Sequence, residues 1–348
     1  MRSSDRVRRD GFALPAVLAV TGVVTLIFLV AITALASLTA EAASARARVR
    51  FLQRALSAEA TLSYLAATEP MRAYGFGVNE VRGFMDERQT EPLPDQSGAT
   101  VEGIRLDDRP YLMDVDGPLV VRMRDQAGMI NMSILYGQPY ERLLEKIGVN
   151  AALRQEMIAR YQDYFDIDDL KQPNGAERRD YPDGGPANRR LMRPAEWLSI
   201  LGAREAVDKQ RWRELRGDLA ADPISFAVNV NTASPAVLAV MFGMNESQAQ
   251  ALIRAREDAP LTSLTQITDI TGIAFSDADF ERSYTYPAGT TILTIRDTRS
   301  AWTYRARLSL TPSGLEQPLW IDQIELTEAP RRAVADTSDA TRLPYAPR

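Results

Sequence analysis

The chain contains no cysteine and no histidine among its 348 residues. Without cysteine it cannot form disulfides, thiolate nucleophiles or cysteine-based zinc sites. Without histidine it lacks the commonest general base and the commonest side-chain metal ligand. Serine–histidine–aspartate and HExxH chemistry are therefore excluded. Any bound metal must rely on oxygen ligands, which favours calcium or magnesium over zinc.

The chain also lacks an excess of positive charge. Its 41 Lys and Arg residues are outnumbered by 46 Asp and Glu residues, which gives a net charge of -5 and a pI of about 5.2. A large nucleic-acid-binding surface normally shows as a basic face, so this balance argues against one. The 45% of hydrophobic residues is ordinary for a globular protein and is enough to build a core.

One long hydrophobic run stands near the N-terminus, because residues 12–38 carry no charged side chain. As a helix, about 27 residues measure roughly 40 Å, which is enough to cross a hydrocarbon core ~30 Å thick. The apolar core of a secretory signal has only about 7–15 residues. The run therefore predicts a single-pass membrane anchor. The preceding arginines predict a cytoplasmic N-terminus, although arginines also follow at positions 46–50.

The junction before this run has a second interpretation. A short basic leader ends in Gly11, and Phe12 opens the apolar helix. This arrangement resembles the processing site of type IV pilin-like proteins, in which a peptidase cuts after the glycine and methylates the new N-terminus. Pro15 would then stand in the first helical turn, where proline is tolerated. Most such proteins carry glutamate five residues after the cut, whereas this chain has Ala16.

The residues after the apolar run still favour a helix. The segment 39–68 is rich in Ala, Leu, Glu, Gln and Arg. Its apolar positions follow a roughly helical spacing. We therefore expect the membrane helix to continue to Thr68, just before Glu69 and Pro70.

Alternating apolar and polar residues predict strands in two separate groups. The first group lies in residues 109–125, and the second comprises residues 290–297, 301–310 and 318–327. Residues 127–282 between them are mostly helical in pattern. The predicted fold is therefore α+β, with a pilin-like long N-terminal helix, an antiparallel sheet and a large α-helical domain inserted between strands. The two ends of such an insertion must lie near each other.

This pattern gives a predicted domain organisation along the chain. Residues 1–11 form a leader, residues 12–38 the transmembrane part of the helix, and residues 39–126 the helical stem and the first part of the sheet domain. Residues 127–282 form the inserted helical domain, and residues 283–328 supply the remaining strands. Residues 329–348 are polar and contain proline, so we expect a disordered tail.

The predicted insertion contains a weak internal repeat. Each copy has an apolar–Asn start, a Leu-rich helix, a glycine turn and a second helix; the starts are Ile130-Asn131 and Val228-Asn229, and the turns are at Gly148 and Gly243. Two helical hairpins are expected. DNA-binding helix-hairpin-helix modules use a Gly-x-Gly turn, but each turn here has one glycine and no basic residue close behind it. Packing is therefore the expected role of the hairpins, and no nucleic acid is expected.

Carboxylates gather in the segment 164–185: Asp166, Asp168, Asp169, Glu177, Asp180 and Asp183. Asp166, Asp168 and Glu177 match positions 1, 3 and 12 of an EF-hand loop. Leu170 and Lys171 exclude that motif, because they stand where an oxygen ligand and a glycine are required. The cluster suits calcium, but a solvated acidic loop paired with nearby arginines explains the spacing as well. Catalysis is not indicated.

Several stretches together resemble the type II secretion system protein K family of minor pseudopilins. They are the Gly11-Phe12 junction, DQAGMINMS, YFDIDDLKQPNGAERRDY, RPAEWLSILG and FAVNVNTASPAVLAVMFGMNESQAQALIRAR, which cover most of residues 8–260 in order. The leader is common to all pilin-like proteins. The acidic loop followed by NVNTAS is the more specific part of the resemblance.

The resemblance implies a non-enzymatic subunit at the tip of the type II secretion pseudopilus. It would sit with two other minor pseudopilins and would initiate and cap the filament that exports folded proteins across the outer membrane. The further partners implied are the major pseudopilin, the prepilin peptidase and the inner-membrane secretion platform. The chain would be held in the inner membrane with its bulk in the periplasm. A tip subunit needs no carboxylate to dock onto a preceding amine, which fits Ala16.

The same resemblance implies calcium, one or two ions, held by Asp166, Asp168, Asp169, Glu177 and Asp180. Arg178 and Arg179 depart from the expected pattern, since they would stand beside the cation. The alternative function is that of a tip minor pilin of a type IV pilus, working in adhesion or in DNA uptake through the hairpins.

Overall fold

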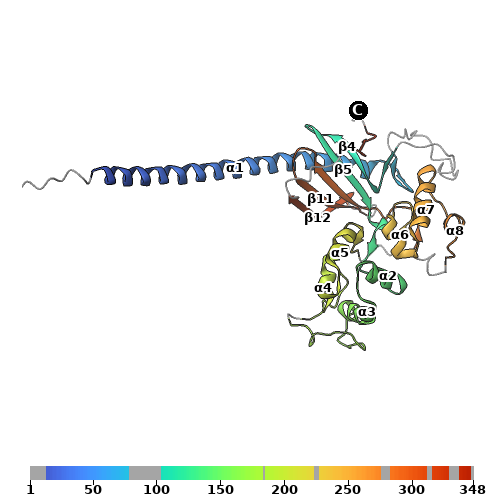
Figure 1. Ribbon diagram of the computed structural model, residues 1–348. Helices are drawn as coiled ribbons and strands as arrows, with labels where there is room; N and C mark the ends of the chain where they lie inside the picture. The colour runs from blue at the N-terminus through green and yellow to red at the C-terminus, as the bar shows by residue number, and fades with distance from the viewer. Residues whose placement is uncertain are drawn as a thin grey trace, which may run out of the picture. The chain divides into compact units, whose positions relative to one another are not determined.

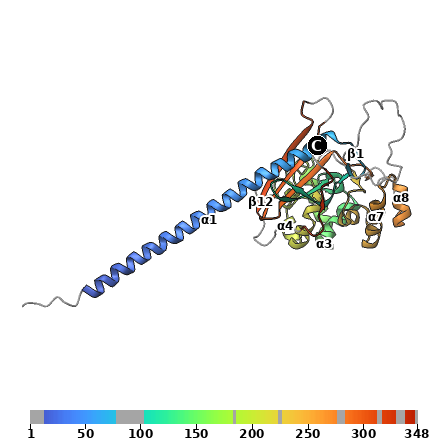
Figure 2. The same ribbon diagram turned by 90° about the horizontal axis from the view of Figure 1, so that it is seen from above.

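The computed structural model describes residues 13–77, 103–182, 185–222, 227–275, 283–311, 316–328 and 337–345. The chain divides into two compact units, Met1–Arg54 and Ala55–Arg348. Figures 1 and 2 show the elements of both from two directions. The predicted leader, residues 1–11, lies outside the described residues, as does Phe12.

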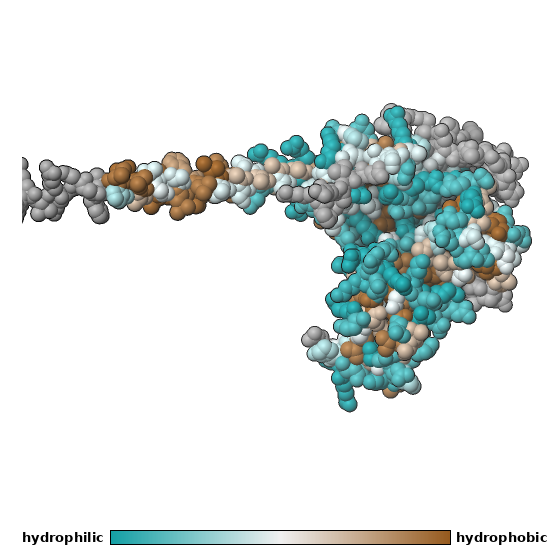
Figure 3. Space-filling model, viewed as in Figure 1, coloured by the Kyte–Doolittle hydropathy of each residue, from teal (hydrophilic) through white to brown (hydrophobic). Residues whose placement is uncertain are grey.

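A single helix, α1 (Ala13–Thr68), runs through the first unit into the second. It is continuous at Pro15 and Gly22, and it is long and apolar enough to cross a membrane. Figure 3 shows hydrophobic residues gathered along its N-terminal part. The hydroxyls of Thr21 and Thr25 donate to the carbonyls of Val17 and Thr21, so these polar groups are satisfied within the helix. The predicted end of the helix at Thr68 is confirmed.

The main sheet of the second unit has six strands in the order β12-β11-β10-β5-β4-β13. The strands are β4 (Asp107–Asp114), β5 (Pro118–Asp125), β10 (Thr290–Asp297), β11 (Trp302–Leu310), β12 (Leu319–Glu328) and β13 (Thr341–Arg342). All neighbours are antiparallel except β13 and β4, which are parallel. The five strands expected from the alternating pattern are confirmed, and so is the α+β class.

A smaller sheet precedes it, made of β1 (Met71–Arg72), β2 (Gly75–Gly77) and β3 (Gly103–Arg105). Its strands approach so closely that a Cβ on Gly75 would lie 2.0 Å from the carbonyl oxygen of Ile104. Glycine is therefore required at this position.

The C-terminal part of α1 lies in the core of the second unit. Ala55, Ala58, Leu62 and Leu65 are fully buried. The Tyr304 hydroxyl donates to the buried carboxylate of Glu59. Burial, together with this contact, raises the pKa of Tyr304, so the phenol stays protonated. The end of the stem is thus part of the globular core rather than a free extension.

The insertion is built from short elements: β6 (Ile130–Asn131), α2 (Gln138–Lys146), α3 (Ala151–Phe165), η3 (Pro194–Ser199), α4 (Ala203–Ala206), α5 (Lys209–Leu215), η4 (Arg216–Asp218), β7 (Leu219–Ala220), β8 (Val228–Asn229), α6 (Pro235–Phe242), α7 (Glu246–Asp258), α8 (Leu264–Thr271) and β9 (Ser283–Tyr284). One hydrophobic cluster joins them. At its centre Trp197 stacks on Trp212 at 5.4 Å and donates to the Tyr140 hydroxyl at 2.9 Å. This cluster gives the insertion a core of its own.

The two halves of the insertion share a local plan, as the sequence repeat predicts. β6 pairs in parallel with β7, and β8 pairs in parallel with β9. Helices α2 and α3 follow the first apolar–Asn strand, and α6 and α7 follow the second. Gly148 and Gly243 turn the chain with φ of 86° and 71°, a left-handed conformation that favours glycine.

Asparagine side chains act as backbone clamps in both halves. Asn131 accepts from Asp222 N at 3.0 Å and donates to Asp222 O at 2.7 Å. Asn231 does the same to Leu261, with distances of 2.8 and 2.9 Å. An amide side chain can bond to both the N–H and the C=O of one distant residue, as a neighbouring strand would. Asn131 in the first half and Asn231 in the second, two residues after the repeat's Asn229, are therefore structural.

The hairpin turns are also occupied by internal bonds. The N–H groups of Gly148 and Gly243 donate to Glu145 O and Ala239 O. The Arg142 side chain of α2 donates to Val240 O and Met241 O, at 2.7 and 2.6 Å, and so caps the C-terminus of α6. These donors are used in packing, which matches the structural role expected for the hairpins.

The second half of the insertion is tied to the sheet by charge. Glu257 of α7 pairs with Arg105 at 3.2 Å and with Arg109 at 2.6 Å. The neighbouring Arg256 is buried and donates to Val230 O and Ala233 O. Burial lowers the pKa of Arg256 to about 10, which leaves it charged at neutral pH. The pairs hold α7 against the edge of β4.

The C-terminal segment departs from the expected disordered tail. β13 pairs with β4 through Thr341–Tyr111 and Arg342–Leu112, and Leu343 is buried. The outer edge of β4 offers unpaired backbone groups, and a few residues suffice to pair with them. Composition gave no signal for such a short strand. Residues 329–336 and 346–348 of the tail lie outside the described residues.

The two ends of the insertion meet at Asp125, the last residue of β5. β5 pairs with β10, and Asp125 stands opposite Thr291. The fully buried Asp125 carboxylate accepts from the N–H groups of Ala127 and Ala288 and from the side chains of Asn229 and Thr232. Burial raises its pKa, and these four donors oppose that effect. The expected closeness of the two ends is confirmed.

We predict that Asp125→Ala lowers the free energy of unfolding by about 3 kcal/mol or more, because it leaves buried donors without an acceptor. Urea denaturation of the detergent-solubilised chain, followed by tryptophan fluorescence, measures this. All 4 tryptophans lie in the second unit and report its unfolding. The control is Asp114→Ala, at an exposed residue that accepts from Gly117 N. Equal losses in the two variants would contradict the assigned role of Asp125.

Candidate metal centre

The acidic loop begins where α3 ends. Asp166 is the C-cap of α3, and its N–H still donates to Gln162 O at 3.1 Å. The chain then turns twice through non-glycine residues with positive φ, Asn174 at 65° and Asn188 at 47°. Asparagine tolerates this conformation better than most residues. The loop therefore folds back on the end of the helix that precedes it.

A carboxylate that sequence reasoning missed organises this loop. Asp163, on the last turn of α3, is fully buried and accepts from Gln172 N at 3.3 and 3.2 Å. Gly175 packs so tightly on it that a Cβ would lie 1.9 Å from Asp163 Oδ2. The helical spacing of Asp163 within an apolar core face was the only available signal. It does not distinguish a buried carboxylate from an exposed one.

Several oxygen atoms of the loop are buried without a partner. Both carboxylate oxygens of Glu177 lack a hydrogen bond within the described part of the chain, as do Asp166 Oδ1 and Asn188 Oδ1. Glu177 is only 6% exposed. Buried acceptors are normally paired, so this set needs a donor or a cation. These oxygens fit the ligand preference of calcium.

The electrostatics of the loop agree with this interpretation. The pKa of Glu177 is raised by burial and then by the negative charges of Asp163 and Asp166. The pKa of Asp166 is raised by burial and then by Asp168 and Asp163. Carboxylates that crowd one another away from water disfavour ionisation unless a cation is present. A divalent ion would remove that penalty.

The other predicted ligands have partners within the protein. Asp180 accepts from Glu177 N at 2.9 Å and from Lys171 Nζ at 3.0 Å, and the first of these bonds lowers its pKa. Asp168 accepts from Leu170 N at 2.8 Å. Asp169 accepts from the Asn188 side chain at 3.3 Å. These three carboxylates therefore stabilise the observed conformation of the loop through hydrogen bonds.

In the described ranges, no three carboxylates are arranged so that they could hold an ion together. The five-residue ligand set therefore stays a prediction, and the unpartnered oxygens single out Asp166 and Glu177 within it. Asp183 lies outside the described residues. Of the arginines near the loop, Arg189 pairs with Glu196, outside the loop, at 2.8 Å.

The structure describes only part of the region around the predicted processing site. Gly11 and Phe12 lie outside the described residues, so cleavage and methylation stay predictions. Ala16 is the fourth residue of α1 and is exposed. Its small side chain leaves no charge in this segment.

Gly175→Ala is expected to lower the free energy of unfolding by about 1–3 kcal/mol, because the new methyl group must displace the buried Asp163 carboxylate. Gly217→Ala is the matched control, since a Cβ at Gly217 would meet no atom within 4 Å. The same urea titration measures both variants. A destabilisation by Gly217→Ala as large as that by Gly175→Ala would show that the close packing is not its cause.

The long apolar helix, the antiparallel sheet and the helical insertion together define a pilin-like fold, whose N-terminal helix is long and apolar enough to cross a membrane. Comparison with known proteins shows which family the chain resembles. Two models of the family described as type II secretion system (T2SS), protein K, match residues 131–223 and 228–281. The type II secretion system protein K of Pseudomonas aeruginosa is 26% identical over 281 residues, which cover 76% of this chain and 79% of that protein.

A solved structure supports the fold over most of the chain. It is the crystal structure of the GspK-GspI-GspJ complex from the type 2 secretion system of enterotoxigenic Escherichia coli. The match has a TM-score of 0.55 and 15% sequence identity, and it covers 82% of this chain and 99% of that chain. The chain is thus similar to the type II secretion system protein K family over residues 131–223 and 228–281, and the predicted resemblance is confirmed.

Proposed function

We propose that this protein is a minor pseudopilin at the tip of the type II secretion pseudopilus, where it initiates and caps the filament that exports folded proteins across the outer membrane. The observation that carries the proposal is the match of the protein K models to both halves of the insertion. The proposal is also supported by a sheet domain that follows, in the sequence, a helix long and apolar enough to span a membrane. The role is structural assembly rather than catalysis.

The proposed position at the tip draws on two features of the chain. Ala16 supplies no carboxylate to pair with the terminal amine of a preceding subunit. The helical insertion has a hydrophobic core separate from that of the pilin-like sheet. In the proposed role, the insertion blocks further subunits from joining above it.

The proposed partners are other pilin-like subunits. The similar E. coli chain was solved in a complex of GspK, GspI and GspJ. By analogy, two other minor pseudopilins would share the tip with this chain, and the major pseudopilin would form the filament below. The inner-membrane platform would drive assembly. The N-terminus would be cytoplasmic and the bulk of the chain periplasmic.

We also propose that the acidic loop binds calcium. Asp166, Glu177 and Asn188 would supply the oxygen atoms that have no partner within the protein. The ion would offset the repulsion among Asp163, Asp166 and Glu177 and would hold the loop against the end of α3. Its role would therefore be to stabilise the insertion.

Leader processing is tested by the intact mass of the protein from membranes with and without the prepilin peptidase. We expect the loss of residues 1–11 and the gain of one methyl group on Phe12, and we expect both changes to depend on the peptidase. A full-length mass in both strains would exclude the assembly role. It would leave an ordinary membrane-anchored protein.

Calcium binding is tested by titrating CaCl₂ into the metal-free, detergent-solubilised chain in a calorimeter. We expect binding that Glu177→Gln weakens at least about tenfold, because the variant removes a charge and an oxygen ligand from the site. Glu205→Gln is the control, since Glu205 is exposed on α4. Calcium should also raise the melting temperature, and EDTA should reverse this. No heat of binding and no shift in melting temperature would contradict the calcium proposal.

A further inference from the structure

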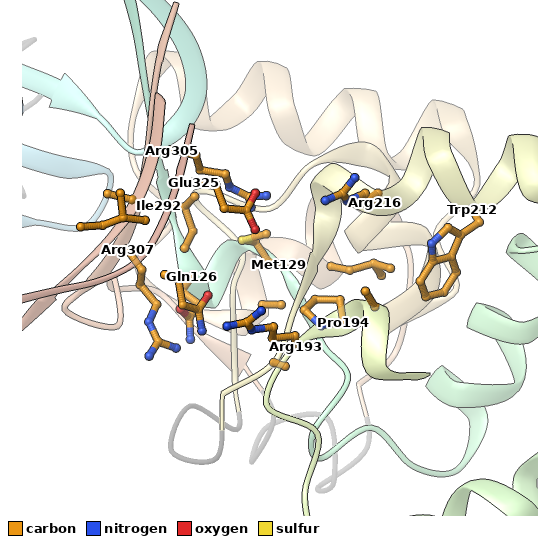
Figure 4. Close-up of a pocket in the computed structure, with 17 residues that line it drawn as sticks. Gln126, Met129, Arg193, Pro194, Trp212, Arg216, Ile292, Arg305, Arg307 and Glu325 are labelled. Carbon is orange, nitrogen blue, oxygen red and sulfur yellow. The ribbon is translucent and has the colours of Figure 1, made fainter. Parts of the chain in front are cut away.

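A cavity of about 240 Å³ lies within the second unit, between the sheet and the insertion. Strands β10, β11 and β12 form one wall, and the segments around η3, α5 and β7 form the other. Figure 4 shows Arg305 and Glu325 on the sheet side, with Arg193 and Arg216 on the insertion side. The cavity is distinct from the acidic loop.

The lining carries more positive charge than the protein neutralises. Arg307 pairs with Asp322 at 2.6 Å. Within the described part of the chain, the side chains of Arg193, Arg216 and Arg305 make no hydrogen bond or ion pair, and Glu325 is the only carboxylate among the lining residues. Three guanidinium groups and one carboxylate therefore line the cavity; Arg305 is partly buried, whereas Arg193, Arg216 and Glu325 are exposed to solvent. Arginine is the side chain best suited to bind a carboxylate through two parallel hydrogen bonds.

The position of Arg305 makes this excess costly. Its side chain is partly buried, and burial lowers its pKa; Glu325 opposes that effect, while Arg216 and Arg124 add to it by repulsion. A partly buried cation with like charges nearby destabilises the folded chain unless an anion approaches it. The cavity thus lacks a counter-charge that a ligand could supply.

The rim of the cavity is an open strand edge. β12 is the last strand of the six-stranded sheet, and no described strand pairs with its outer side. A bulge interrupts its pairing with β11 between Arg305 and Arg307, and Gln323 there has a φ of 49°. Bulges and left-handed non-glycine residues gather at binding sites, where they redirect side chains.

Exposed apolar side chains accompany this edge. Trp320 is 55% exposed and Ile324 is 58% exposed, and Ile324 also lines the cavity. Natural edge strands are usually covered, charged or broken to prevent pairing with other chains. The other edge of the sheet is the two-residue strand β13, whereas the ten-residue strand β12 presents large apolar groups beside the arginines of the cavity. An unpaired edge of this kind is suited to strand addition.

We propose that the arginine-lined cavity and the outer edge of β12 together receive a short, extended, acidic segment of another pilin-like subunit. The inference rests on the proposed function, since it assigns part of the contact that holds the tip together. A peptide satisfies the three features at once: its carboxylates enter the cavity, its backbone pairs with β12, and its apolar side chains cover Trp320 and Ile324. A free anion would satisfy only the charge.

The test is co-purification of the tagged full chain with pilin-like subunits of the same secretion system, produced together and extracted in detergent. Arg305→Gln and Arg216→Gln remove charge from the cavity while keeping side chains of similar shape. Arg213→Gln is the control, because Arg213 is exposed on α5 and does not line this cavity. Ile324→Lys tests the strand edge. The melting temperature of each variant shows whether it is folded.

We expect the wild type and Arg213→Gln to recover partners equally. Arg305→Gln should weaken binding at least about tenfold, because a partly buried ion pair with the partner is lost, and Arg216→Gln, at an exposed residue, should weaken it less. Rising KCl should weaken the wild type more steeply than Arg305→Gln. Equal recovery by folded cavity variants would overturn the inference while leaving the proposed function intact. Failure of the wild type to recover any pilin-like subunit would overturn both. Inorganic phosphate should compete with the partner for the wild type but not for Arg305→Gln. This difference would support charge recognition by the cavity.

Discussion

The buried carboxylate of Asp125 holds the insertion to the sheet at the point where the chain leaves the sheet and returns to it. It ends β5, and it accepts hydrogen bonds from the chain that leaves the sheet, from the insertion and from the chain that returns. A buried charge is tolerated only when such donors surround it, so its position fixes theirs. An apolar residue would fill the space without specifying which segments meet there. Asp125 also helps to position one wall of the cavity, because Gln126 and Ile292, the residues that follow Asp125 and Thr291, line it.

The insertion repeats one solution to a local problem. Each half starts with a two-residue parallel ladder and uses an asparagine side chain to pair with a distant peptide unit. Each then reverses its helices at a left-handed glycine. Short elements of this kind cannot bury enough surface alone, so the shared cluster around Trp197 is what makes them stable. Because this cluster supplies the stability, the surface of the insertion can include irregular segments such as the acidic loop.

Sequence patterns recovered the elements whose periodicity is strong. The end of α1 at Thr68, the five main strands and the two hairpins follow from apolar spacing and from glycine and proline signals. β13 was missed because a strand of two residues has no period. In the acidic loop, composition identified the region. It could not separate the unpartnered oxygens of Glu177 from Asp180, whose carboxylate is used by Lys171 and a backbone N–H. That difference depends on tertiary contacts, as do the charges that meet around Arg305.

The pairing of Asp125 with Thr291 has a consequence for how the chain reaches its native state. Joining two strands separated by so many residues carries a large loss of chain entropy, and topologies of this kind fold slowly. The contacts that join the two halves of the insertion, such as that from Arg142 to Val240, bridge fewer residues than the pairing of Asp125 with Thr291, so we expect the insertion to form before the sheet closes. Once formed, it brings its two ends together, and β5 and β10 then meet as neighbours in a hairpin would. The added domain thereby acts as an internal template for the sheet that it interrupts.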